Sequence, residues 1–199
     1  MIMETSNNTN VPKRAVNLYL EANPNPNSLK FVANYMLVPE GESFDFPDKA
    51  AAEHAPLALE LFELDYVERV FFMSNFVTVT KAEDKEWEEI QEELKAIIKH
   101  YLEQDKPLIT KFSETTQAAI EETEIEKNIK NILDEYVRPA VEQDGGAISF
   151  HSYNEGVVKV LLQGSCSGCP SATITLKAGI ENLLKRMVPE VTTVEAEGV

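Results

Sequence analysis

The only two cysteines of the chain, Cys166 and Cys169, lie in one short stretch from Gly164 to Pro170. Their Cys-x-x-Cys spacing lets two thiols bind one metal ion or cluster edge, or form a strained disulfide. A run with strand character precedes the motif, and a helical pattern follows it. The fold therefore has to present a sulfur pair where a strand passes into a helix.

The residues around the sulfurs favour anionic thiolates. Pro170 stands where the helix begins, a position at which its missing N–H is harmless. Free backbone N–H groups and the positive end of the helix dipole lower a thiol pKa. Gly164 and Gly168 lack side chains that would keep N–H groups away from sulfur. We therefore expect a loop organised to hold bound anionic sulfur.

The residues flanking the motif predict a small α/β unit. The expected elements are a helix at 120–143, strands at 147–153 and 157–163, a helix at 171–187 and a short edge strand at 191–194. Glycine tolerates the left-handed backbone of a helix end, so Asp144-Gly145-Gly146 should stop the first helix. Pro139 should kink or tighten its last turn.

The first half predicts a second small sheet with helices. The expected elements are strands at 13–21, 29–38, 66–72 and 76–80, and helices at 48–64 and 84–104. Pro56 should kink or break the first helix. The run Asn23 to Ser28 is typical of a turn between strands, with a recognition surface as the alternative.

These patterns predict an α/β (α+β) chain of two small domains, each a short sheet with packed helices. The expected division is a disordered N-terminus at 1–12, a domain at 13–106, a linker at 107–116 and a second domain at 117–199.

The composition limits the classes of partner and the cellular location that we expect. The net charge is −16, and both halves of the chain are acidic, so neither nucleic acid nor an anionic membrane surface is an expected partner. No run approaches 18 apolar residues, which excludes a membrane-spanning helix. Two cysteines are far from a secreted disulfide framework, and the first residues lack the pattern of a signal or transit peptide. We expect a cytoplasmic location.

Several chemistries compete for the sulfur pair. A zinc site needs four ligands, and none of the three histidines, His54, His100 and His151, has ligand spacing to the motif. They are expected to be surface or strand residues. A thioredoxin-like thiol-disulfide oxidoreductase uses the same strand, motif and helix, but needs further elements after its motif helix. Glycine and serine neighbours disfavour a pair of inert core cysteines.

An iron-sulfur cluster is the remaining candidate for what the two cysteines bind. Such clusters normally take four thiolates, and one chain supplies two. A two-fold dimer would complete the set with Cys166 and Cys169 from each copy. A cluster held by half the usual ligands per chain should be transferable, which favours storage and delivery over electron transfer.

Residues 125–191 resemble the C-terminal domain of the NifU, or Nfu, family of iron-sulfur scaffold and carrier proteins. The similarity is carried by Leu133–Pro139, Asp144–Ile148, Gly164–Ser171, Thr175–Glu181 and Val188–Val191. The resemblance implies that Cys166 and Cys169 ligate a cluster shared across a homodimer, with 4Fe-4S favoured and 2Fe-2S as the alternative. It further implies a carrier rather than an enzyme, with a cluster donor scaffold and recipient apo iron-sulfur proteins as partners.

Residues 13–102 resemble, less closely, the N-terminal domain of many Nfu proteins. The matching segments are Asn25–Phe31, Pro56–Phe62, Val70–Phe72 and Phe76–Lys81. The chain departs from the family at Asp65-Tyr66 and at Met73–Asn75, both at turns. The resemblance implies a role in partner contact. A non-catalytic adaptor with a vestigial motif is the third class of function that we consider.

Overall fold

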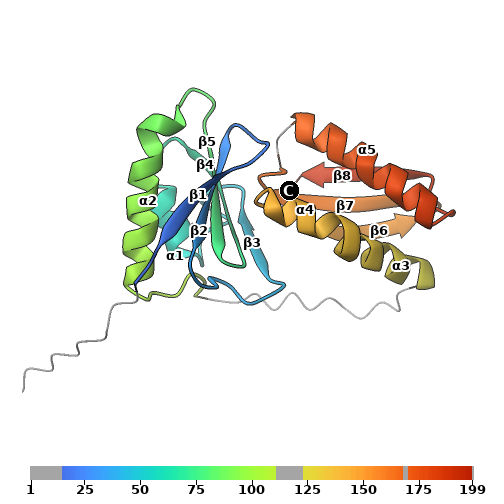
Figure 1. Cartoon of the computed structure of the whole chain (residues 1–199), viewed down its shortest axis with the longest axis horizontal. Helices are drawn as coiled ribbons and strands as arrows, with labels where there is room; N and C mark the ends of the chain where they lie inside the picture. Colours follow the sequence, from blue (N-terminus) through green and yellow to red (C-terminus); the bar gives the residue numbers. More distant parts are fainter. Residues whose placement is uncertain (1–14, 111–122, 168–169, 199) are drawn as a thin grey trace, which may run out of the picture.

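The computed structural model describes residues 15–110, 123–167 and 170–198, the side chains of 170–173 excepted. These residues form a five-stranded and a three-stranded sheet that lie side by side, each with helices on one face (Figure 1). The predicted class, two small α/β sheets with packed helices, is confirmed. The predicted disordered segment 1–12 and linker residues 111–116 lie outside the described residues, and the domain boundaries stay predictions.

The first sheet and its helices form the N-terminal unit, which runs from β1 to α2. Its strands are β1 (Leu18–Ala22), β2 (Ser28–Ala33), β3 (Ser43–Phe46), β4 (Val67–Met73) and β5 (Phe76–Lys81), in the order β1-β2-β5-β4-β3 with every neighbouring pair antiparallel. Its helices α1 (Pro56–Leu61) and α2 (Trp87–Glu103) cover one face of the sheet (Figure 1).

The interior strand β4 is buried on both faces. Val70 and Phe72 face the helices and belong to the core of the N-terminal unit. Phe71 and Met73 point the other way, into a small apolar cluster that includes Ala147 of the second sheet. Side chains alternate across a strand, so two buried faces mean that the sheet is covered on both sides. The face that carries Phe71 and Met73 is covered by the second sheet.

Four expectations for the N-terminal unit are corrected. The helix expected at 48–64 is limited to Pro56–Leu61: a bend and turns occupy 48–54, and Pro56 breaks the expected helix by beginning α1, where its fixed φ fits and no N–H is needed. The strand expected at 29–38 ends at Ala33, and the strand expected at 13–21 begins at Leu18. β3 was not predicted, because a four-residue edge strand carries too little alternation to recognise.

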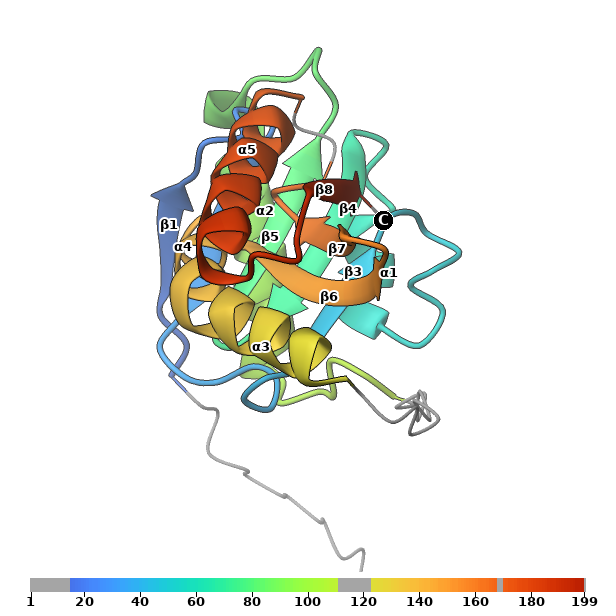
Figure 2. The ribbon, with the colours of Figure 1, turned by 90° about the vertical axis from the view of Figure 1, so that its right-hand side faces the viewer.

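The second sheet and its helices form the C-terminal unit, which runs from α3 to β8. Its elements are α3 (Glu124–Ile132), the π-helical segment η1 (Leu133–Val137), α4 (Arg138–Gln143), β6 (Gly146–Asn154), β7 (Val157–Gly164), α5 (Pro170–Met187) and β8 (Thr193–Gly198). β6 and β7 are antiparallel. The expected edge strand is present as β8, though it begins later than 191, and it pairs parallel to β7. The helices share one face of the sheet (Figures 1 and 2).

Pro139 acts on its helix differently from the expectation. The helix does not tighten; it widens into η1, where the N–H of Arg138 donates to the carbonyl of Leu133, five residues back. Proline has no N–H for the carbonyl four residues earlier, and its ring crowds that carbonyl. The wider turn accommodates both effects.

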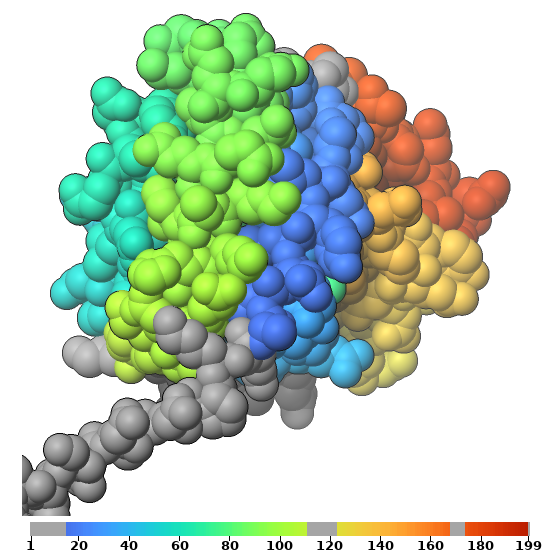
Figure 3. All heavy atoms as spheres, turned by 60° about the vertical axis from the view of Figure 1, so that its left-hand side comes forward, coloured from blue at the N-terminus to red at the C-terminus, as the bar shows by residue number. Residues whose placement is uncertain are grey.

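The two units meet through strands as well as loops. β7 contacts β4 and β5, and Figure 3 shows the surface of β1 and β2, in blue, between α2 and the C-terminal unit. Among the described residues, no helix is long and apolar enough to cross a membrane.

Candidate functional site

The cysteine loop, residues 164–169, joins β7 to α5, as the sequence predicts. β7 ends at Gly164, whose φ of +65° is in the left-handed region. Beyond it, the N–H of Ser165 donates to the carbonyl of Gly145 at 3.3 Å, and that of Ser167 donates to Gly164 at 3.1 Å. The loop therefore turns back onto the segment that links α4 to β6. Cys169 lies outside the described residues.

The segment that links α4 to β6 is shaped to receive the cysteine. α4 ends at Gln143, which confirms the helix stop, and Gly145 has a φ of +79°. A Cβ on Gly146 would lie 2.9 Å from Sγ of Cys166, closer than carbon and sulfur can approach. Gly146 is thus required for close contact with the sulfur.

Ser165 anchors the loop beside the sulfur. Its hydroxyl donates to the carbonyl of Asp144 and lies 3.9 Å from Sγ of Cys166. Ser165 is 2% exposed and Cys166 is 6% exposed. Cys166 also belongs to the apolar core of the C-terminal unit. The described half of the sulfur pair is therefore held in a fixed, largely dry environment.

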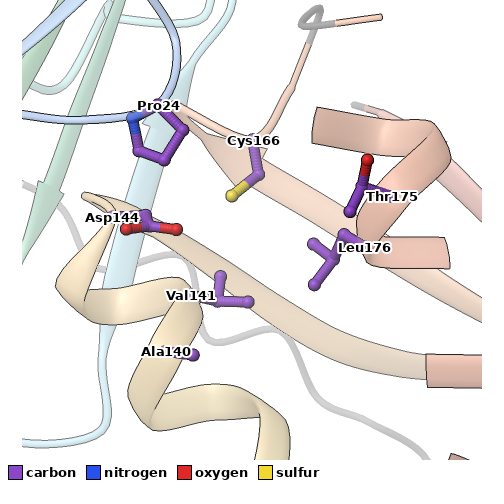
Figure 4. A pocket seen from close by; sticks show the side chains of 7 residues that line it. All are labelled: Pro24, Ala140, Val141, Asp144, Cys166, Thr175 and Leu176. Atoms are coloured by element: carbon purple, nitrogen blue, oxygen red, sulfur yellow. The ribbon is translucent and has the colours of Figure 1, made fainter. Parts of the chain in front are cut away.

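Cys166 lines a pocket of about 340 Å³ between the two units. Figure 4 shows its sulfur directed toward Asp144 and Val141. The other residues that line the pocket are Pro24, Ala140, Thr175 and Leu176. All but Pro24 come from the C-terminal unit, so one residue of the Asn23–Ser28 turn forms part of the wall around the cysteine.

Two further residues of the N-terminal unit hold the loop backbone. Nδ2 of Asn25 donates to the carbonyl of Ser165 at 3.0 Å, and Oγ1 of Thr78 donates to that of Gly145 at 2.8 Å. Asn25 is 6% and Thr78 1% exposed. The sequence prediction missed both. A polar residue on the second buried face of β5 was the available signal, since a buried hydroxyl needs a partner.

Lys30 on β2 makes a similar contact. Its Nζ donates to the carbonyls of Glu142 and Gln143, both at 3.3 Å, at the end of α4. It also pairs with Glu21 at 3.3 Å and lies 4.4 Å from the centre of the Phe76 ring. A cation at a helix C-terminus is favourable for the helix dipole.

Asp45 on β3 faces the same region. Burial raises the pKa of its carboxyl to about 6, against the opposing effects of Arg69, 2.6 Å away, and of the N–H of Gly164. Desolvation penalises the charged form more than these two groups favour it. The carboxyl therefore titrates next to the residue at which the cysteine loop begins.

The histidines lie where the sequence predicts. His100 on α2 and His151 on β6 are exposed, and His54 is half-buried in the turns before α1. Across 15–110, 123–167 and 170–198, no three His, Cys, Asp or Glu side chains gather as a metal site. Among the described residues, Cys166 is thus the candidate ligand, and thiolate chemistry suits iron-sulfur clusters and other soft metals.

Two family models match the chain. The model described as the scaffold protein Nfu/NifU N-terminal domain matches residues 18–105, and that of the NifU-like domain matches 129–195. The cysteine motif lies within the second match.

Curated relatives match along most of the chain. A human protein named "NFU1 iron-sulfur cluster scaffold homolog, mitochondrial" is 40% identical over 92% of this chain and 73% of its own length. Proteins of the same name from Drosophila persimilis and Drosophila willistoni are 40% and 41% identical, over 94% and 92% of this chain. The chain spans 67% and 64% of these two fly proteins.

Among solved structures, the NMR structure of a NifU-like protein from Saccharomyces cerevisiae is similar. It shares 24% identity with a TM-score of 0.45, over 49% of this chain and 87% of the yeast chain.

Proposed function

Because the chain belongs to the Nfu family of iron-sulfur cluster scaffold proteins, we propose that Cys166 and Cys169 bind an iron-sulfur cluster and deliver it to apoproteins. The observation that carries the proposal is the position of the motif, on a glycine-lined loop between β7 and α5 inside the NifU-like match. A cluster in this loop would be cargo.

A homodimer completes the ligand set. A cluster takes four ligands, and the chain contains two cysteines. A two-fold axis beside the loop supplies the other two thiolates from the same surface of a second copy. We propose a 4Fe-4S cluster, with 2Fe-2S as the alternative, since either type accepts two thiolates from each chain.

The loop chemistry supports reversible binding. The α5 N-terminus favours the thiolate form of cysteines placed there. Each copy holds only half of the cluster's ligands, so a recipient protein can replace one copy at a time. We propose a cluster donor scaffold and recipient apo iron-sulfur proteins as partners, and no catalytic reaction. A net charge of −16 disfavours nucleic acid and anionic membranes as further partners.

The location stays a prediction. We expect a cytoplasmic protein, whereas the fly and human relatives carry the word mitochondrial in their names. Fractionation of cells that express the full-length protein tests the expectation.

Anaerobic reconstitution with iron and sulfide tests the proposed function. We expect a brown protein with about two irons per chain for a shared 4Fe-4S cluster. Cys166→Ser and Cys169→Ser should each remove the colour, whereas His151→Ala, at an exposed position, should keep it. A colourless parent protein, or full cluster binding by either cysteine variant, contradicts the proposal.

A thiol-disulfide oxidoreductase predicts a different result. It would reduce protein disulfides without iron, through a thiolate at the motif. The iron-free parent protein should show no more disulfide reduction than Cys166→Ser, and faster reduction would favour the oxidoreductase.

A further inference from the structure

The proposed function does not explain why buried polar side chains of the N-terminal unit form hydrogen bonds with the C-terminal unit. Asn25 and Thr78 are among the most buried polar residues of the N-terminal unit, yet each donates to the backbone of the C-terminal unit. Burying a polar group is costly unless it is hydrogen-bonded. These side chains therefore favour the arrangement in which the two units are docked.

We propose that Asn25 and Thr78 are positioning residues of the cysteine loop, so that the N-terminal unit forms part of the cluster site and restrains cluster release. This role rests on the proposed function only in that the ligand of the cysteines is taken to be an iron-sulfur cluster. The contacts themselves concern Cys166, whatever the sulfur binds.

Asn25 acts on the peptide group that leads into the cysteine. Its Oδ1 accepts from the N–H of Asn27, which fixes the turn, and its Nδ2 donates to the carbonyl of Ser165. That carbonyl and the nitrogen of Cys166 belong to one planar peptide group. Holding the carbonyl therefore fixes the orientation of the backbone at Cys166.

Thr78 and the loop share one acceptor. The carbonyl of Gly145 receives the hydroxyl of Thr78 at 2.8 Å and the N–H of Ser165 at 3.3 Å. A carbonyl oxygen has two lone pairs and accepts both. The N-terminal unit thus holds the same backbone atom that anchors the start of the cysteine loop.

Pro24 closes the arrangement at the surface, where it lines the pocket beside Cys166 (Figure 4). If the N-terminal unit separated, Ser165 would lose its side-chain donor and the pocket would lose one wall. Exposure of Cys166 should therefore depend on opening of the contact between the units. Local opening of this kind sets the rate at which buried groups react.

The reaction of Cys166 with iodoacetamide tests the proposal on the full chain without a cluster. Cys169→Ser is introduced throughout, so that Cys166 is the only thiol. Thr78→Val keeps the shape of the side chain and removes the donor. Asn25→Asp keeps the acceptor for Asn27 and removes the donor to Ser165. Each variant should react about fivefold to tenfold faster than its parent, the effect of one lost hydrogen bond on opening.

Thr80→Val is the matched control. Thr80 lies on the same strand, and its Oγ1 is 2.8 Å from Oγ of Ser28, within the N-terminal unit. Its variant loses a hydroxyl contact without touching the loop, so Cys166 should react within about twofold of the parent rate. A general loss of stability would accelerate all three variants, whereas a positioning role accelerates Thr78→Val and Asn25→Asp alone.

Folding is checked by circular dichroism, and rates are compared among variants with native spectra at the reaction temperature. If Thr78→Val and Asn25→Asp both react at the rate of Thr80→Val, the proposal is overturned. In the reconstituted protein with both cysteines, the two variants should also lose iron to a chelator faster than Thr80→Val. A parent that binds no cluster counts against the proposed function only, because the iodoacetamide reaction needs no iron.

Discussion

The ring of Phe71 lies directly against Gly164, the residue at which the cysteine loop begins. A Cβ on Gly164 would fall 2.8 Å from Cδ1 of Phe71, and the φ of +65° is one that L side chains rarely adopt. Phe71 is on β4 of the N-terminal unit and Gly164 ends β7. The start of the cysteine loop therefore has to be glycine for two reasons, its own backbone and the contact between the units.

Gly164→Ala should lower the free energy of unfolding by about 1–3 kcal/mol, because a left-handed backbone and a close contact both oppose the new methyl group. Urea denaturation measures the change. Gly179→Ala is the control, since nothing lies within 4 Å of a Cβ there and alanine favours helix by roughly 0.5–1 kcal/mol. Equal stability of the two variants would contradict this account of Gly164.

Lys30→Met should destabilise the protein by about 1–2 kcal/mol. The substitution keeps an apolar stem but removes the Nζ that donates to Glu142 and Gln143 and lies over the Phe76 ring. Lys49→Met is the comparison, because Lys49 pairs with Glu63 on the surface, where an ion pair contributes at most about 1 kcal/mol. Thermal unfolding of both variants measures the difference. An equal loss of stability would show that Lys30 does not stabilise the contact between the units.

Asp45→Asn should change how stability depends on pH. The folded-state pKa is raised from 3.8 to about 6, so the native state binds the proton more tightly than the unfolded state. The stability that Asp45 contributes is full below pH 3.8 and is lost as pH rises through about 6. As pH rises through that window, the free energy of unfolding of the variant should increase by on the order of 2–3 kcal/mol relative to that of the parent.

Urea denaturation between these pH values measures the gain. Arg69, the cation that faces Asp45, keeps an amide acceptor in the variant. A stability difference that does not change with pH would show that Asp45 has an ordinary pKa.

The strands and the last helix of the C-terminal unit could be predicted from local sequence patterns. Alternation over 147–153 and 157–163, the glycine pair at 145–146 and the proline at the start of α5 each predict one element, and β6, β7 and α5 occur there. Such signals depend only on neighbours in the chain, so a single sequence carries them. The strand-to-helix position of Cys166 followed in the same way.

The docking of the two units did not follow from local signals. The contact of Asn25 with Ser165 joins residues 140 positions apart, and that of Thr78 with Gly145 joins residues 67 apart. The Asn23–Ser28 run showed a turn but not what the turn touches. The sequence predicted a strand at 66–72 followed by a turn at Met73–Asn75, but not that Phe71 and Met73 pack against the second sheet, because an apolar strand does not say which partner covers each face.

We expect one cluster to join two copies of the chain through Cys166 and Cys169. Native mass spectrometry of the anaerobically reconstituted protein distinguishes such a dimer from a cluster bound by a single chain. We predict a species with the mass of two chains and one iron-sulfur cluster, which separates into single chains when a chelator removes the iron. A cluster carried by a single chain, or the same species formed by Cys166→Ser, would contradict the claim.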